Sequence, residues 1–90
     1  MDKIKILVVD DESRMRKLVS DFLTRKGYAV IEAADGVEAV DTFMENKDIA
    51  LIILDVMMPK MNGFDVCKNI RQAKINVPIL MLTAKGTISD

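Results

Sequence analysis

Two short apolar runs that end in acidic residues most constrain the fold of this chain. Residues 6–9 stop at Asp10, Asp11 and Glu12, and residues 51–54 stop at Asp55. Uninterrupted apolar runs of this length are typical of strands that are covered on both faces, as in parallel sheets. In such sheets, ligands bind in the crevice at the carboxyl ends of the strands. We therefore expect the aspartates to crowd together at one edge of a sheet.

Acidic side chains crowded in this way repel one another unless a cation lies between them. Carboxylate oxygens suit Mg²⁺, which takes one or two carboxylates and keeps several waters. The pattern therefore indicates a site for metal-assisted phosphoryl chemistry. A second interpretation makes Asp11 or Ser13 the N-cap of the following helix, and both roles are compatible because a helix N-terminus favours anions. We expect Glu12 to be a solvated acid rather than a ligand.

Composition describes one small domain and excludes several functions. The 90 residues carry 13 basic and 14 acidic side chains, so no strongly basic face indicates nucleic-acid binding. The longest apolar run, residues 49–54, is too short to span a bilayer, and the N-terminus lacks the apolar core of a secretory signal. The single cysteine, Cys67, cannot form an internal disulfide and fits a reducing compartment. We expect a cytoplasmic protein.

Strands and helices are predicted to alternate along the chain, which favours a parallel sheet with helices on both faces. The predicted strands cover residues 4–9, 29–33, 50–54 and 77–82. A first helix over residues 13–26 is predicted to end in a left-handed cap at Gly27. A second helix begins at Asp35-Gly36 and ends near Asn46. The predicted inner faces are Met15, Leu18, Val19, Phe22 and Leu23 in the first helix, Val37, Val40, Phe43 and Met44 in the second, and Phe64, Cys67 and Ile70 in a third.

Four short segments carry a resemblance to a known family. They are Val8-Val9-Asp10-Asp11-Glu12, Asp55-Val56-Met57-Met58-Pro59, Lys60-Met61-Asn62-Gly63 and Leu82-Thr83-Ala84. In this order and at these spacings, they resemble the receiver domain of two-component response regulators, and the resemblance covers the whole chain. It implies an α/β fold, the flavodoxin-like doubly wound parallel sheet, with the strand order 2-1-3-4-5 that is known for receiver proteins.

The resemblance also implies a role for each site residue. Asp55 would be the phosphoacceptor, a carboxylate that attacks a phosphoryl group supplied by the phosphohistidine of a sensor histidine kinase. Asp10, Asp11 and Asp55 would hold Mg²⁺ together with the backbone carbonyl of Met57. The Thr83 hydroxyl would be the switch that moves to the phosphoryl group, and Ala84 the small residue that leaves it room. The expected role is signalling rather than enzymatic.

The chain departs from the family where it ends. The resemblance is to one receiver domain over residues 1–90, truncated before the fifth strand and fifth helix, so we expect an incomplete fold of four strands and about three helices. The family's phosphate-pairing lysine has no counterpart, because Lys85 follows the fourth strand and lacks the Lys-Pro context. The fourth strand would become an exposed edge, which predicts self-association by edge pairing or segment exchange. The Leu18/Phe22 face of the first helix would be uncovered.

Three other functions compete with phosphoryl-accepting signalling. The first is a structural fragment of a receiver that keeps the metal pocket but cannot signal. The second is a haloacid-dehalogenase-type phosphatase, which needs an aspartate two residues after the nucleophile, where this chain has Met57. The third is a flavodoxin-type flavin binder, whose phosphate would be repelled by Asp10, Asp11 and Glu12.

Overall fold

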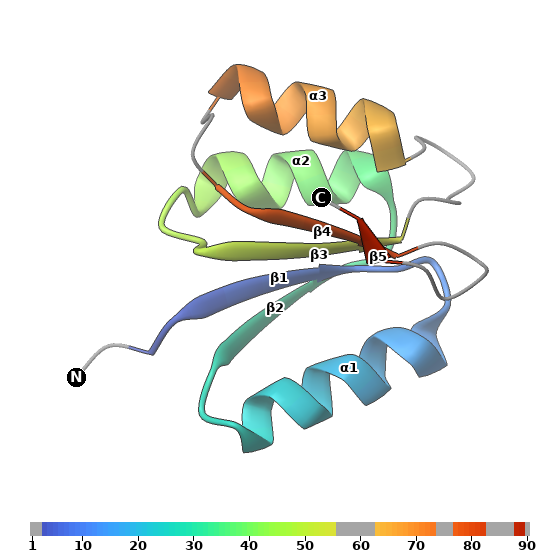
Figure 1. Cartoon of the computed structure of the whole chain (residues 1–90), viewed down its shortest axis with the longest axis vertical. Helices are drawn as coiled ribbons and strands as arrows, with labels where there is room; N and C mark the ends of the chain where they lie inside the picture. Colours follow the sequence, from blue (N-terminus) through green and yellow to red (C-terminus); the bar gives the residue numbers. More distant parts are fainter. Residues whose placement is uncertain (1–2, 56–62, 74–76, 83–87, 90) are drawn as a thin grey trace.

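The computed structural model describes residues 3–55, 63–73, 77–82 and 88–89, and strands and helices alternate along them as predicted (Figure 1). The elements are β1 (Lys5–Val9), α1 (Ser13–Arg25), β2 (Ala29–Ala33), α2 (Gly36–Glu45), β3 (Leu51–Asp55), α3 (Gly63–Ala73), β4 (Ile79–Leu82) and β5 (Ile88–Ser89). Predicted and observed bounds differ by at most two residues for the strands β1 to β4. No helix in this part of the chain is long and apolar enough to cross a membrane.

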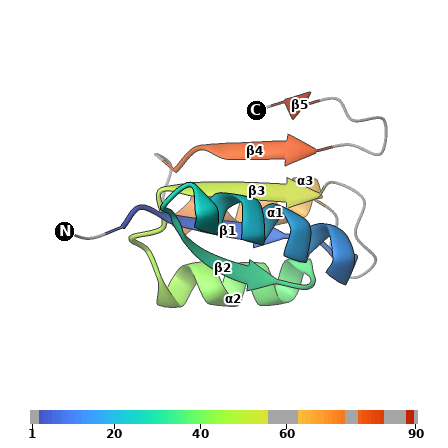
Figure 2. The same ribbon diagram turned by 90° about the horizontal axis from the view of Figure 1, so that it is seen from below.

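The strands form one sheet in the order β2-β1-β3-β4-β5 (Figure 2). β1 pairs with β2 and β3, and β3 pairs with β4, all in parallel, so the predicted order of the four strands is confirmed. The structure differs from the prediction at the edge, because β5 pairs antiparallel with β4 through Met81↔Ser89 and Leu82↔Ile88. The two-residue strand was not predicted because its sequence, Ile88-Ser89, is too short to show a period.

The core is much larger on one face of the sheet than on the other. α2 and α3 cover one face and α1 covers the opposite face (Figure 1). Side chains alternate between the faces of a strand, and Leu7, Val9, Ile52 and Leu54 belong to a buried cluster with Phe43 of α2. Val66 and Ile70 of α3 join the same cluster. On the α1 side, Ile6 and Val8 are buried, but Ile53 of β3 and Leu80 of β4 remain partly exposed.

The inner face of α2 differs from the predicted one. Phe43 is buried and Val40 is partly buried, as predicted, but Val37 and Met44 are exposed. The remaining buried residues of α2 are Gly36 and Ala39. The side of α2 that carries Gly36, Ala39 and Phe43 is therefore the buried one, and Val37 and Met44 lie outside it.

The ends of α1 agree with the prediction at one terminus and not at the other. Gly27 has φ 98° and follows the C-cap Lys26. Its N–H donates to Thr24 O at 3.1 Å, and the Tyr28 N–H donates to Leu23 O at 3.1 Å, which is the Schellman pattern. At the N-terminus the cap residue is Glu12, whose side chain makes no capping hydrogen bond. The interpretation of Asp11 or Ser13 as the N-cap is therefore wrong.

Candidate metal centre

The sheet register brings the predicted acids together at the carboxyl edge of β1 and β3. Val9 pairs with Leu54, so Asp10 and Asp55 are the next residues on two adjacent strands. Asp10, Asp11 and Asp55 each present a carboxylate oxygen, and these oxygens lie within 4.8 Å of one another. Asp10 and Asp55 are partly buried, whereas Asp11 is exposed. The convergence predicted from the two apolar runs is therefore confirmed.

Asp10 is held in place by three hydrogen bonds at different atoms. Its N–H donates to Ala33 O at the end of β2, at 3.2 Å. Its Oδ1 accepts the N–H of Glu12 at 2.9 Å. Its backbone carbonyl accepts a hydrogen bond from Nη1 of Arg16 at 2.7 Å. The turn between β1 and α1 is therefore tied to β2 and to the first turn of α1, which fixes the direction of the Asp10 carboxylate.

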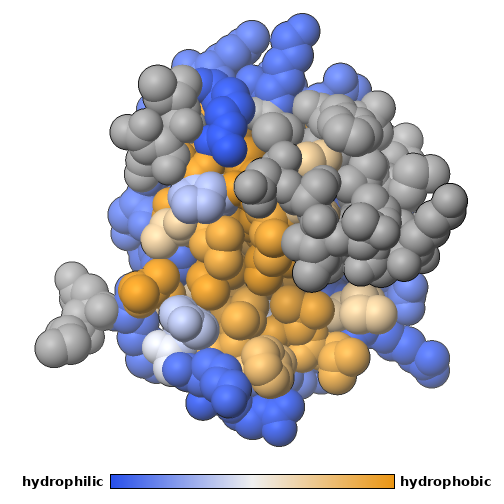
Figure 3. All heavy atoms as spheres, viewed as in Figure 1, coloured by the Kyte–Doolittle hydropathy of each residue, from blue (hydrophilic) through white to orange (hydrophobic). Residues whose placement is uncertain are grey.

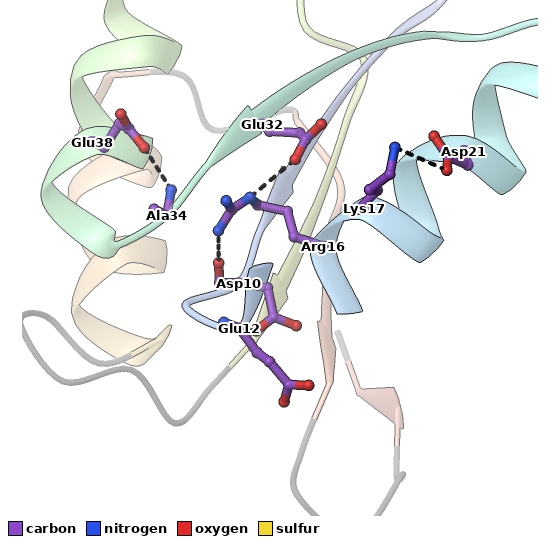
Figure 4. Close-up of polar contacts among 8 residues, drawn as sticks. All are labelled: Asp10, Glu12, Arg16, Lys17, Asp21, Glu32, Ala34 and Glu38. Atoms are coloured by element: carbon purple, nitrogen blue, oxygen red, sulfur yellow. Dashed lines mark hydrogen bonds and ion pairs between the residues drawn. The ribbon is translucent and has the colours of Figure 1, made fainter. Parts of the chain in front are cut away.

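Arg16 connects this turn to β2 through a second contact (Figure 4). Its Nε donates to Oε1 of Glu32 at 3.0 Å, while Nη1 holds the Asp10 carbonyl. The Arg16 side chain is 18% exposed, so this ion pair is screened by solvent less than the more exposed Lys17–Asp21 pair. The planar guanidinium can donate to both acceptors at once, whereas a lysine ammonium does not present donors in this fixed planar arrangement.

The sequence analysis missed Arg16 and Glu32, although two signals were present. Glu32 pairs in register with Val8, so it lies on the α1 side of the sheet. Arg16 lies one helical turn before Ser20, the buried residue of α1. The two periods place an acid on the α1 side of β2 and a cation one turn from the buried side of α1, but which residues meet depends on how α1 crosses the sheet. The pair therefore could not be located from the sequence alone.

A second set of hydrogen bonds fixes the loop that follows β2. Asp35 is the N-cap of α2, and its Oδ1 accepts the N–H of Glu38 at 2.8 Å. Oε1 of Glu38 accepts the N–H of Ala34 at 2.5 Å (Figure 4). This reciprocal arrangement resembles a capping box shifted by one residue. It orders the chain beside Ala33, whose carbonyl holds Asp10.

The donor set at this edge fits a hard divalent cation. Three carboxylates within 4.8 Å repel one another by about 1 kcal/mol for each pair in a water-like medium. Among the described residues, the Asp11 side chain makes no hydrogen bond or ion pair, so its oxygens are available as ligands. Oxygen ligands with room for several waters are what Mg²⁺ requires. Glu12 is exposed and does not belong to the group of acids.

Three of the predicted site residues lie outside the part of the chain that the structure describes. They are Met57, Thr83 and Ala84. Their predicted roles, as a backbone ligand, a switch and a small residue beside the phosphoryl group, remain predictions. The described site therefore consists of Asp10, Asp11 and Asp55, together with the Arg16–Glu32 pair that supports it.

Comparison with known proteins supports the function suggested by this geometry. The family model described as the response regulator receiver domain matches residues 6–90. The chain is 54% identical over 86 residues to the alkaline phosphatase synthesis transcriptional regulatory protein PhoP of Bacillus subtilis, which covers 96% of the chain and 35% of PhoP. It is 51% identical over 86 residues to the transcriptional regulatory protein ResD of the same organism, which covers 94% of the chain and 35% of ResD. The chain thus spans about a third of the length of these relatives.

Solved structures share the fold. The Vibrio cholerae chemotaxis protein CheY4 superposes with a TM-score of 0.89 and 40% identity, over 96% of this chain and 72% of that one. The Thermotoga maritima response regulator TrrA gives a TM-score of 0.85 and 40% identity, over 90% of this chain and 70% of that one. The TrrA structure is a complex with Mg²⁺ and a beryllium fluoride.

Proposed function

This chain belongs to the family of response regulator receiver domains, and on that premise we propose that Asp55 is its phosphoacceptor and that Asp10, Asp11 and Asp55 hold Mg²⁺. Receiver domains are signalling domains of two-component systems, and they interact with sensor histidine kinases. The observation that supports the proposal most directly is the approach of the three carboxylates to within 4.8 Å at the ends of β1 and β3. The Met57 backbone carbonyl would be a further ligand.

The proposed reaction moves one phosphoryl group between two side chains. An Oδ atom of Asp55 attacks the phosphorus in line, an O–P bond forms, and the P–N bond to the donor imidazole breaks. The electron pair of that bond stays on the imidazole nitrogen, which takes a proton from water as it leaves. The products are an aspartyl phosphate and a neutral histidine.

The residues around Asp55 make this attack feasible. Carboxylate and phosphoryl group are both anionic, and a bound Mg²⁺ would supply charge neutralisation between them. Asp10 and Asp11 would hold the ion together with Asp55, since their oxygens lie within 4.8 Å of an Asp55 oxygen, and the Arg16 contact to the Asp10 carbonyl keeps the turn in place. The Thr83 hydroxyl would then move to a phosphoryl oxygen, and Ala84 would leave the group room.

The test is to phosphorylate the purified chain with acetyl phosphate and Mg²⁺ and to record its intact mass. We expect a gain of one phosphoryl group that hydroxylamine removes, because hydroxylamine cleaves acyl phosphates. Asp55→Asn keeps the size of the side chain and should abolish the gain. Asp41→Asn changes an exposed acid of α2 outside the site and should leave the gain intact.

Two outcomes would contradict the proposal in different ways. A gain that persists in Asp55→Asn would assign the phosphoryl group to another residue. No gain from a chain shown by circular dichroism to be folded would favour the alternative of a receiver fragment that keeps the metal pocket and cannot signal. Calorimetric titration with Mg²⁺ separates that alternative from a chain without any metal site.

Self-association through the edge of β4 also remains a prediction. β5 pairs with Met81 and Leu82, and β3 pairs with all four residues of β4. Within the described residues, Ile79 and Leu80 have no strand partner on the β5 side. Pairing with β5 therefore covers two of the four β4 residues that the sequence analysis expected at an exposed edge. Segment exchange is the other predicted route.

A further inference from the structure

Glu38 is an acid near the metal site that does not belong to the converging carboxylates. In the view of Figure 3, hydrophilic residues surround an apolar centre, as expected for charged side chains that contact solvent. Glu38 is exposed as well, but its Oε1 accepts the N–H of Ala34 at 2.5 Å (Figure 4). A hydrogen bond from a backbone N–H to a carboxylate is charge-assisted and stronger than one to a neutral acceptor. Glu38 therefore holds the loop between β2 and α2 in addition to contacting solvent.

The N–H that Glu38 binds belongs to the peptide group that joins Ala33 to Ala34. The carbonyl of the same peptide group accepts the N–H of Asp10 at 3.2 Å. The described residues contain no cis peptide bond, so the carbonyl and the N–H of this group point in opposite directions. The Glu38 carboxylate and the Asp10 N–H therefore lie at the two ends of one peptide dipole. A single planar unit thus connects an acid of α2 to an acid of the metal site.

Hydrogen bonds at the two ends of a peptide group strengthen each other. A negative charge beside the N–H polarises the group and makes its carbonyl oxygen a better acceptor. Ala33 is only 1% exposed, so solvent competes little for that carbonyl. We therefore expect the bond from the Asp10 N–H to the Ala33 carbonyl to be stronger with the Glu38 carboxylate in place than without it.

The bond between Ala33 and Asp10 lies at the end of the pairing between β1 and β2. The register of the two strands ends at Val9↔Ala33, and the chain then turns toward α1. The ends of paired strands open more easily than their middles. Oδ1 of Asp10 accepts the N–H of Glu12, so a shift of this turn would carry the carboxylate with it. A contact that closes the end of the pairing therefore also fixes a candidate metal ligand.

Glu38 is itself held in place by Asp35. Oδ1 of Asp35 accepts the N–H of Glu38 at 2.8 Å, and the Asp35 carbonyl accepts the N–H of Ala39 at 3.0 Å. Ala39 is fully buried, so the first turn of α2 is anchored in the core. The Glu38 side chain therefore reaches back to the loop from a fixed backbone position.

We propose that Glu38 is a positioning residue of the metal site, acting on Asp10 through the peptide group between Ala33 and Ala34. This inference rests on the proposed function, because it assigns to Glu38 part of the task of holding a metal ligand. Arg16 binds the Asp10 carbonyl at 2.7 Å from α1 (Figure 4). The two backbone groups of Asp10 are thus held from two helices, the carbonyl by a cation directly and the N–H by an anion through one peptide group.

The test compares Glu38→Ala and Glu38→Gln with the wild-type chain. Both variants remove one negative charge, but only glutamine keeps a side-chain oxygen that can accept the Ala34 N–H. Alanine is the best helix former, so an effect of Glu38→Ala does not come from a lower helix propensity. Glu45→Ala removes an exposed acid from the last turn of the same helix and is the matched control.

The first measurement is the NMR spectrum of the metal-free chain. In Glu38→Ala, the Asp10 amide proton should move upfield and exchange with solvent faster, whereas Glu38→Gln should lie closer to the wild type. Glu45→Ala should match the wild type. The Ala29 amide is the internal reference, because it donates to Ile4 O at 2.9 Å near the other end of β1 and β2. If Glu38→Ala changed the Ala29 and Asp10 amides alike, its effect would be on the whole fold, and the inference would be wrong.

The second measurement is calorimetric titration with Mg²⁺. In Glu38→Ala the Kd should rise about twofold to tenfold, less than for the loss of a group bonded directly to a ligand side chain. Glu38→Gln should show a smaller rise, and Glu45→Ala none. Equal values for Glu38→Ala and Glu38→Gln would assign the effect to the lost charge and overturn the inference, as would an unchanged Asp10 amide in Glu38→Ala. A wild-type chain that binds no Mg²⁺ would instead overturn the proposed function, so the two failures are distinguishable.

Discussion

At the scale of single residues, the site depends on groups that perform no chemistry themselves. Asp10 directs a carboxylate toward Asp11 and Asp55, but its position is set by Arg16, which binds its carbonyl at 2.7 Å and pairs with Glu32 at 3.0 Å. A charged donor to a partly buried carbonyl is worth more than a neutral one. We therefore expect Arg16 to act as a positioning residue for the metal site.

Replacing Arg16 by Met tests this role. The apolar stem is kept, but both hydrogen bonds are lost, so the free energy of unfolding should fall by about 1–3 kcal/mol. The affinity for Mg²⁺ in calorimetric titration should fall several-fold, because the turn that carries Asp10 loosens. Arg16→Lys should keep more of the Mg²⁺ affinity than Arg16→Met does, but less than the wild type. Lys17→Met, at an exposed position on the same helix, is the control, and equal effects of Lys17→Met and Arg16→Met would contradict the role.

The buried hydroxyl group of Ser20 is expected to lower the stability of the fold. It is buried within α1, and its Oγ has no hydrogen-bond partner among the described residues. Ser20→Ala removes an unsatisfied hydroxyl and introduces the best helix former, so we expect the free energy of unfolding to rise by about 1 kcal/mol. Urea unfolding monitored by circular dichroism measures it. As a control, replacing the exposed Ser13 by Ala should change the free energy of unfolding by less than about 0.5 kcal/mol. If Ser20→Ala were destabilised, the Ser20 hydroxyl would make a stabilising hydrogen bond and the prediction would be wrong.

At the scale of elements, the termini of α1 and α2 are stabilised in different ways. α2 begins with a side-chain cap from Asp35 and the reciprocal contact of Glu38. α1 begins at Glu12 without such a cap and ends in the Schellman pattern around Gly27. The end of α1 therefore depends on the one residue of the described chain with positive φ.

Gly27→Ala should destabilise the protein by about 1 kcal/mol, because L-residues other than glycine are strained at φ 98°. The added Cβ would meet no heavy atom within 4 Å, so the cost is one of backbone conformation and not of packing. Gly27→Asn should cost less, since asparagine tolerates the left-handed region. Chemical unfolding of the three proteins would contradict this account if Ala and Asn were equivalent to Gly.

At the scale of the whole molecule, the metal site and the fold are thermodynamically linked. The three clustered carboxylates repel one another in the metal-free protein, and the unfolded chain lacks this cluster. A cation that binds the folded chain alone raises its stability by RT ln(1 + [L]/Kd), or about 2.7 kcal/mol at a hundredfold excess over Kd. Metal binding and removal should therefore be visible in the melting temperature.

Asp11→Asn separates the two contributions. Without metal, the variant should melt higher than the wild type by an amount that corresponds to about 1–2 kcal/mol, because Asp11 takes part in two of the three repelling pairs. With Mg²⁺, the wild-type melting temperature should rise and that of Asp11→Asn should stay nearly constant. Asp41→Asn and NaCl at equal ionic strength are the controls. An equal response of Asp11→Asn and wild type to Mg²⁺ would remove Asp11 from the ligand set.

Much of the fold and the centre of the site could be predicted because they depend on local patterns. Apolar runs that end in acids placed Asp10, Asp11 and Asp55 at the ends of adjacent strands, and strand ends in a parallel sheet share one edge. Gly27 marked a helix end because few other residues adopt its backbone conformation. Each of these inferences needs only the neighbours of a residue along the chain.

The features that could not be predicted depend on how elements face one another. Hydropathy predicted Val37 and Met44 as core residues of α2, but the buried side of the helix carries Gly36, Ala39 and Phe43, and both predicted residues are exposed. Arg16 meets Glu32 because two elements with different periods cross at one point. β5 pairs with β4 although its two residues carry no pattern. The sequence by itself thus determined the strand order by resemblance and the acidic edge by pattern. Only tertiary packing decided that Val37 and Met44 of α2 stay exposed, because burial is a property of pairs of surfaces and not of single segments.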